Sequence, residues 1–123
     1  MKWIPEMIIE GVHMPVPDGF DQSISDLCSS DSKRLMSGKA IKKVVTVKST
    51  FSLKWQGVEW RKAAELVNAI DGKNELTIKA MDARNPYKMT EFKIYVNDRS
   101  CKPSKFDDDG KVYWDIEFKE IEL

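Results

Sequence analysis

Residues 42–55 read KKVVTVKSTFSLKW, and this stretch carries the pattern that decides the fold. From residue 45 to residue 55 the odd positions are apolar, with Ser49 as the exception, and the even positions are polar. Alternation of this length is typical of a β-strand with one buried and one solvent-exposed face. The side chains expected to face the core are Val45, Val47, Phe51, Leu53 and Trp55.

A helix is predicted directly after this strand. Gln56-Gly57 breaks the alternation, and residues 58–72 (VEWRKAAELVNAIDG) then place apolar side chains three and four positions apart. This spacing predicts an amphipathic helix of about a dozen residues, which Asp71-Gly72 would end. Its expected core-facing residues are Trp60, Ala63, Ala64, Val67 and Ile70.

Shorter apolar patterns before and after this strand–helix unit predict further strands. Residues 4–16 indicate a hairpin that turns at Glu10-Gly11, and its prolines confine it to the edge of a sheet. Residues 20–28 indicate a half-buried strand. Three more strands are expected at 75–81, 89–99 and 111–123, with a turn at 82–88 between the first two.

The last predicted strand contains a change of pattern. Val112, Trp114, Ile116 and Phe118 share one face, but the apolar positions then move to Ile121 and Leu123. A shift of this kind predicts a β-bulge or a change of packing partner near Lys119.

The predicted elements sum to about seven strands and one helix in a chain of 123 residues, the length of one ordinary domain. We therefore expect a single, mainly β (α+β) domain spanning residues 1–123. Because each strand has one apolar face, the compact solution is an antiparallel β-sandwich or a curled barrel, with the helix covering one side.

The bulk composition argues against several classes of partner. Twenty basic and twenty acidic residues balance, so no overall field favours nucleic acid or an acidic membrane. No segment approaches the ~20 apolar residues of a membrane helix, and the first sixteen residues do not read as a signal peptide. Cys28 and Cys101 are expected to be free thiols of a cytosolic protein, with a disulfide or a functional thiol as the alternatives.

The run Asp107-Asp108-Asp109-Gly110 is the most conspicuous candidate for a metal site. Consecutive aspartates cannot all point at one ion from an extended chain, and a calcium loop needs ligands at alternate positions. Asp-Gly before an alternating segment is instead a hairpin signal. A turn is therefore the preferred interpretation, and a weak cation site is the alternative.

No other group of residues predicts catalysis. His13 is the only histidine, which excludes a multi-histidine metal site. Gly38-Lys39 lacks the spacing of a phosphate loop. Asp115 and Glu117 alternate with Lys119 on what should be a solvated strand face. We expect no catalytic residue, no metal and no cofactor, and hence a protein that is not an enzyme.

A polar segment before the long strand is the candidate partner-contact loop. It is long for a plain connection, and long loops without secondary structure commonly carry function. We predict that it contacts a neighbouring subunit or another protein. Its residues are Ser29, Ser30, Asp31, Ser32, Lys33, Arg34, Leu35, Met36, Ser37, Gly38, Lys39 and Ala40.

The order of these signals resembles a family of small phage and prophage proteins encoded among the tail genes of siphophages that infect Gram-positive bacteria. The residues that carry the resemblance are the strand VVTVKSTFSLKW, the turn before Phe92, the segment FKIYVNDR, and the closing W-D-I-x-F. The resemblance covers nearly the whole chain, and its motifs are structural. It implies a β-sandwich flanked by one helix, like tail-tube proteins and the ring domain of distal tail proteins.

The resemblance also implies a function in the tail. The expected role is a virion structural or assembly protein that self-associates, as in a hexameric ring, or docks onto other phage tail proteins. It would occupy the host cytoplasm during assembly and the virion tail afterwards. The alternative is a small β-sandwich that binds carbohydrate or peptide; Tyr95 and Tyr113, on the outward strand faces, would suit such a surface or a subunit interface.

Overall fold

The computed structural model describes residues 3, 5–28, 33–34, 40–41 and 44–123, and most of its strands belong to one antiparallel sheet. Eight strands are joined in the order β2-β1-β7-β8-β10-β6-β3, with β9 also on β10, while β4 and β5 form a separate pair. The elements are β1 (Met7–Ile9), β2 (Val12–Met14), β3 (Gly19–Cys28), β4 (Lys33–Arg34), β5 (Ala40–Ile41), β6 (Val44–Glu59), α1 (Trp60–Ile70), β7 (Leu76–Asp82), β8 (Asn85–Tyr95), β9 (Arg99–Phe106) and β10 (Val112–Glu122).

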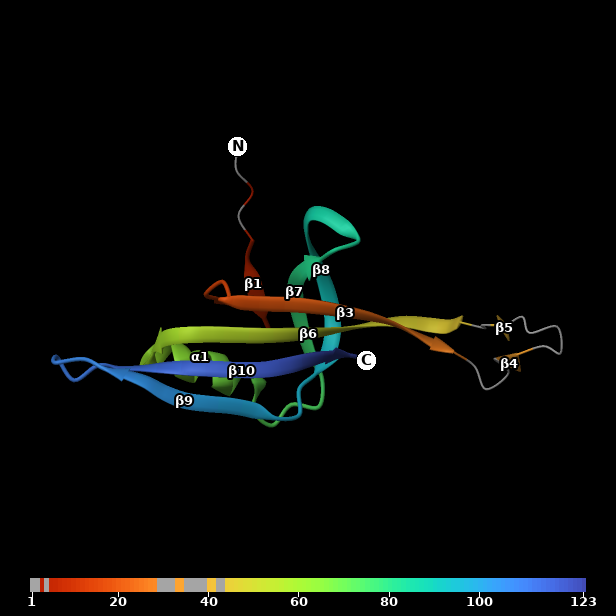
Figure 1. The fold of residues 1–123 in the computed structure, drawn as a ribbon. Coiled ribbons are helices and arrows are strands. Elements are labelled where there is room, and N and C mark those ends of the chain that lie inside the picture. Colours follow the sequence, from red (N-terminus) through yellow and green to blue (C-terminus); the bar gives the residue numbers. More distant parts are fainter. Residues whose placement is uncertain (1–2, 4, 29–32, 35–39, 42–43) are drawn as a thin grey trace.

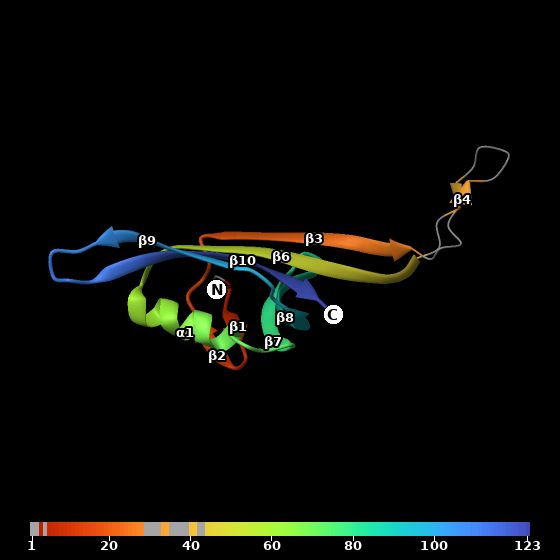
Figure 2. The ribbon, with the colours of Figure 1, turned by 90° about the horizontal axis from the view of Figure 1, so that it is seen from below.

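The sheet curls into two layers because β10 has different neighbours along its length. On one side it pairs with β6. On the other side it pairs first with β9 and then, at Ile121 and Glu122, with β8. Figures 1 and 2 show the result: β3, β6, β10 and β9 form a long layer, and α1, β1, β2, β7 and β8 lie against one side of it. The predicted mainly β class is confirmed, as one curled sheet that does not close.

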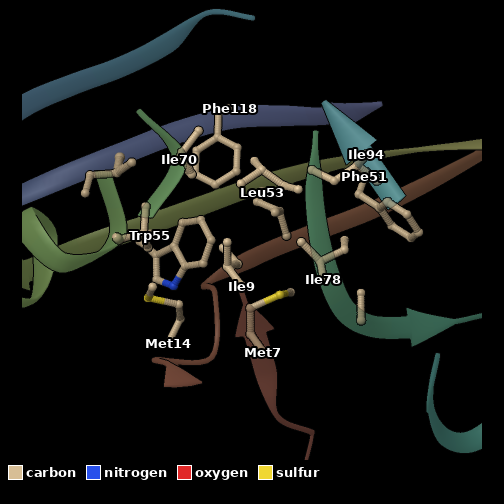
Figure 3. Close-up of a cluster of buried hydrophobic side chains, with 14 of the residues drawn as sticks. Met7, Ile9, Met14, Phe51, Leu53, Trp55, Ile70, Ile78, Ile94 and Phe118 are labelled. Carbon is tan, nitrogen blue, oxygen red and sulfur yellow. The ribbon is translucent and has the colours of Figure 1, made fainter. Parts of the chain in front are cut away.

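The core lies between these two layers. Phe51, Leu53 and Trp55 of β6 are almost completely buried, as predicted, and Figure 3 shows them facing residues of β1, β7 and β8. Trp55 stacks on Phe118 with ring centroids 5.4 Å apart. The buried apolar residues are Met7, Ile9, Met14, Phe51, Leu53, Trp55, Val58, Ala63, Leu66, Ile70, Leu76, Ile78, Ala80, Phe92, Ile94, Ile116 and Phe118.

The predicted helix is confirmed, and α1 begins at a bulge in β6. Gly57 adopts a positive φ of 66°, and its N–H donates to Asp115 Oδ1 at 2.9 Å. The side chain of Glu59 then caps the helix by accepting from Arg61 N at 2.9 Å. Glycine suits this position because other residues strain in that conformation.

The buried residues of α1 are Ala63, Leu66 and Ile70, while Ala64 and Val67 of the predicted stripe are half-buried. Leu66 is completely buried although it was not among the expected core residues, while Trp60 is 54% exposed although it was. Trp60 is the first residue of the helix, at its open end, and its ring packs on Trp114 at 5.6 Å instead of entering the core. The end of the helix at Asp71, whose N–H donates to Val67 O at 3.0 Å, agrees with the prediction.

Both predicted hairpin turns are confirmed. Glu10 and Gly11 have φ of 51° and 78°, so the β1–β2 turn has the two positive φ values of a type I′ hairpin. Its strand β2 lies at a sheet edge, as expected, but β1 lies inside the sheet between β2 and β7. The aspartate run forms the turn between β9 and β10, where Gly110 N donates to Asp107 O at 3.0 Å.

Strand β9 was missed because its sequence has no apolar alternation. RSCKPSKF contains Pro103, and nearly all its side chains are exposed on both faces. Only the pairing with β10 holds it in the sheet. Strand β8 also begins earlier than predicted, at Asn85, so the tight turn between β7 and β8 contains only Ala83 and Arg84.

Of the two alternatives expected near Lys119, the change of packing partner is confirmed, because β10 pairs with β9 as far as Phe118 and with β8 from Ile121. The bulge is wrong. Pairing between β10 and β6 continues without interruption from Ile116 to Ile121, and the register shift falls earlier, between Trp114 and Ile116. Because the alternation continues, Glu120 points into the core opposite Phe51 and is completely buried. Neither carboxylate oxygen has a hydrogen-bond partner in the described part of the chain. Burial raises the pKa of Glu120 to about 8.

Glu120 should make the protein less stable as the pH rises. The unfolded chain releases this proton near pH 4.5 and the folded chain near pH 8, so the free energy of unfolding should fall through this window and level off above it. At about 1.4 kcal/mol per pKa unit, the loss is on the order of 4–5 kcal/mol. Glu120→Gln should remove the dependence.

Urea unfolding of the native chain and of Glu120→Gln between pH 4 and pH 9 measures this effect. Glu117→Gln is the matched control, because Glu117 lies on the same strand with an exposed side chain. Equal pH dependence in the native chain and Glu120→Gln would refute the buried position of the carboxyl group.

Candidate assembly surface

Strands β3 and β6 form a hairpin that extends beyond the rest of the sheet. They pair from Gly19 with Lys54 to Cys28 with Val44. Strand β10 accompanies β6 only as far as Thr50. Residues 24–28 and 44–48 therefore pair with each other alone, and Figures 1 and 2 both show this end of the hairpin projecting past the two layers. We call these two segments the arm.

The arm exposes an unusual concentration of apolar side chains. Val45 and Val47 lie on the same strand face as Phe51, but they are 69% and 40% exposed because the second layer ends before it reaches them. The predicted alternation is therefore correct, while the predicted burial of these two valines is wrong. The exposed apolar residues of the arm are Ile24, Leu27, Val44, Val45 and Val47.

Apolar residues occur on both faces of the arm. The register places Ile24 on the face of Val45 and Val47, and places Leu27 with Val44 on the opposite face. The predicted half-burial of residues 20–28 thus holds only near Phe20 and Gln22. Side chains of this kind on two solvent-exposed faces indicate an interaction surface.

The predicted partner-contact loop follows the arm. Within it, β4 pairs with β5 through Lys33 with Ile41 and Arg34 with Ala40. Residues 29–32 and 35–39 of the predicted loop lie outside the described residues. That the loop contacts a neighbouring subunit stays a prediction; its described strands, β4 and β5, lie between β3 and β6 in the chain.

A polar network fixes the base of the arm. Arg84, in the turn after β7, binds Asp82 through Nε–Oδ1 at 2.9 Å and Nη2–Oδ2 at 3.0 Å. Gln22 of β3 donates to Asp82 Oδ1 at 3.1 Å and accepts from Ala83 N at 2.8 Å. The network therefore ties the β7–β8 turn to the point where β3 enters the arm.

Ser49 completes this network and explains its own place in the sequence pattern. Its hydroxyl accepts from Gln22 Nε2 and Arg84 Nη2, each at 3.3 Å. Its backbone N–H donates to Glu122 Oε1 at 2.7 Å, where β10 stops pairing with β6. The polar residue that interrupts the alternation of β6 is thus completely buried. It marks the boundary between core and arm.

The long layer ends in two open edges of opposite charge. Among the strands that the structure describes, β3 pairs only with β6, and β9 pairs only with β10. The β3 edge carries Asp21 and Asp26 and no basic residue. The β9 edge carries Arg99, Lys102 and Lys105 and no acidic residue. The two edges are complementary in charge, and they lie at opposite sides of one sheet.

The residues considered for catalysis are dispersed. His13 is exposed on β2, and Asp115 is used at the β6 bulge. Within the described ranges, no three His, Cys, Asp or Glu side chains gather where a metal ion could bind. Cys101 is an exposed free thiol, and the side chain of Cys28 is outside the described part.

The remaining surface features include the outward tyrosines and one helix. Tyr95 and Tyr113 are partly exposed, and Lys105 lies 5.7 Å from the centre of the Tyr113 ring. Helix α1, of 11 residues, falls short of a membrane span, and no helix in the described ranges meets that requirement.

Comparison with family models and with curated protein sequences gives no match. No family model fits the chain, and no curated protein is similar to it at a significant level. The resemblance to tail proteins therefore rests on the residues quoted above. The function has to be argued from the arm, the edges and the clefts.

The Asp82 network should stabilise the fold except in strong acid. Hydrogen bonding to Arg84 lowers the pKa of Asp82 to about 2 from 3.8. The stabilisation is present above pH 3.8 and is lost as the pH falls toward 2. Since Arg84 is partly exposed, screening should limit it to roughly 1–2 kcal/mol.

Unfolding of Asp82→Asn at pH 7 and at pH 2 tests this expectation. The variant should lose stability at pH 7 and match the native chain at pH 2. Asp109→Asn, in an exposed turn, is the control and should change little at either pH. A loss of the same size at both pH values would show that the network does not depend on the charge of Asp82.

Proposed function

We propose that this protein is a non-catalytic structural or assembly protein of a phage tail, which self-associates, as in a hexameric ring, or docks onto other tail proteins. The observation that carries the assembly role is the arm, with apolar side chains exposed on both faces beyond the core. The tail assignment comes from the resemblance of residues 44–55, 92–99 and 114–118.

The arm supports assembly because it contributes little to the fold of a single chain. Its apolar side chains contact no second layer, so their burial has to come from a partner. Its base is fixed by the contacts of Ser49 and Asp82, which give it a defined direction. A projecting element held in one direction suits docking, since less freedom is lost on binding.

The open edges support self-association in particular. A strand edge can add a strand from a second chain through backbone hydrogen bonds. Pairing of an acidic β3 edge with a basic β9 edge would be heterologous, so each copy would bind one neighbour through its β3 edge and another through its β9 edge. Contacts of this type generate rings or open filaments.

Polar substitutions in the arm should weaken assembly and leave the fold intact. We expect Val45→Thr with Val47→Thr to shift self-association at least tenfold toward the monomer, because both methyl-rich side chains lose apolar area in the interface. Both residues are exposed, so the melting temperature should change little.

Sedimentation velocity over a range of protein concentrations measures this shift. Val12→Thr is the matched control, because Val12 is an exposed valine on β2, away from the arm. If the isolated native chain is monomeric, co-sedimentation with purified tail proteins replaces self-association as the measurement. Unchanged association of the arm variant would argue against the arm as the contact surface.

Charge reversal provides a separate test of the two edges. Asp21→Lys makes the β3 edge less acidic, and Lys102→Glu with Lys105→Glu makes the β9 edge acidic. Each variant alone should self-associate more weakly than the native chain. Mixing the two should restore association, because the unaltered β9 edge of the Asp21→Lys variant then meets the unaltered β3 edge of the other variant.

Association of the mixture, measured by light scattering, should decrease with salt. The expected product is a heterodimer, since the altered β3 edge has no net charge left to attract the altered β9 edge. A mixture that behaves as the sum of its two components would exclude pairing of β3 with β9, while leaving the arm experiment unaffected.

A further inference from the structure

A cleft lies near the base of the arm, beside the turn between β7 and β8. It has a volume of about 540 Å³, within the range of small-molecule sites. Figure 1 shows the chain before β1 and the β7–β8 turn rising on the same side of β3. Its lining includes Trp3, Phe20, Asp21, Asn85, Tyr87 and Lys88.

Tyr87 reaches this cleft through an irregularity in β8. Met81 pairs with Met89 and Asp82 pairs with Asn85, so residues 86–88 have no partner on β7. Tyr87 lies in this bulge with a φ of 57° and is 77% exposed. A bulky side chain in the left-handed region is strained, and bulges commonly redirect side chains beside functional sites.

The strain at Tyr87 is not explained by the core. The ring contacts Trp3 edge to face, with centroids 6.2 Å apart and planes at 77°, and both residues line the cleft. An exposed aromatic pair at a strained position serves no packing role in the two layers. The pair leaves aromatic surface available to a ligand that enters the cleft.

Hydrogen bonds hold the polar side chains of the cleft in place. Asp82 is pinned by Arg84 and Gln22, and Asn85 Nδ2 donates to it at 3.4 Å. Asn85 places its amide in the same lining, and Arg84 compensates the charge of Asp82. These fixed polar groups favour a ligand without net charge.

We propose that this cleft binds a neutral saccharide. A sugar ring offers C–H faces that pack on aromatic rings, and hydroxyl groups that donate to carboxylate and amide oxygens. The cleft combines apolar rings with a few placed polar groups, as binding sites do. A proline-rich peptide also packs in aromatic grooves, but its prolines have no N–H to donate to the amide oxygen of Asn85.

The test is a titration of the full chain, labelled with ¹⁵N, with three trisaccharides: chitotriose, cellotriose and maltotriose. At least one should shift the Trp3 indole resonance and the amides of Asn85, Tyr87 and Lys88 in a saturable manner at millimolar concentration. Tyr87→Asn should reduce affinity at least tenfold. Asparagine tolerates the left-handed conformation, so the melting temperature of this variant should be equal or higher.

Asn85→Ala should weaken binding as well, and Trp60→Ala should not, because Trp60 is an exposed tryptophan outside the cleft lining. Absence of saturable shifts with all three sugars would overturn the proposal. So would binding of decaproline in their place, or full affinity in Tyr87→Asn. Since the arm and the open edges have their own variants, these outcomes leave the assembly proposal to be judged separately.

Discussion

The structure depends on the pairing of β10 with three different strands. Strand β6 covers one side of it, while β9 and then β8 share the other. The change from β9 to β8 turns one sheet into two layers and brings Phe118 and Ile94 to the same core. It also leaves β3 and β9 as the outer strands of the long layer. Core, arm and open edges all follow from this one strand.

Much of this fold could be predicted from the sequence, because the spacing of apolar residues matches the element that forms in β6, α1, β7 and the β1–β2 hairpin. The failures have physical reasons. Strand β9 carries no apolar alternation, since backbone pairing with β10 holds it in place. Glu120 follows the pleat into the core although its charge argues against burial. Alternation identifies a strand face; only the second layer determines how far along the strand that face is buried.

The candidate surfaces show the same limit. The valines of β6 read as core residues, and nothing local distinguishes Val47 from Phe51. The distinction comes from where β10 ends, which is a property of pairing between distant segments. The cleft is also assembled from distant segments, since Trp3, Phe20 and Tyr87 have no common motif. Its one local signal was the proline-containing turn before Met89, which the structure turns into the bulge that carries Tyr87.

The placement of β1 has a consequence for the order in which the chain folds. Ile8 and Ile9 pair with Lys79 and Ile78, so the first hairpin joins the sheet through contacts about seventy residues away in sequence. During synthesis from the N-terminus, Met7 and Ile9 have no layer to enter until β7 has left the ribosome. The β3–β6 hairpin is completed earlier. The nascent chain thus presents its projecting hairpin before it has a closed core.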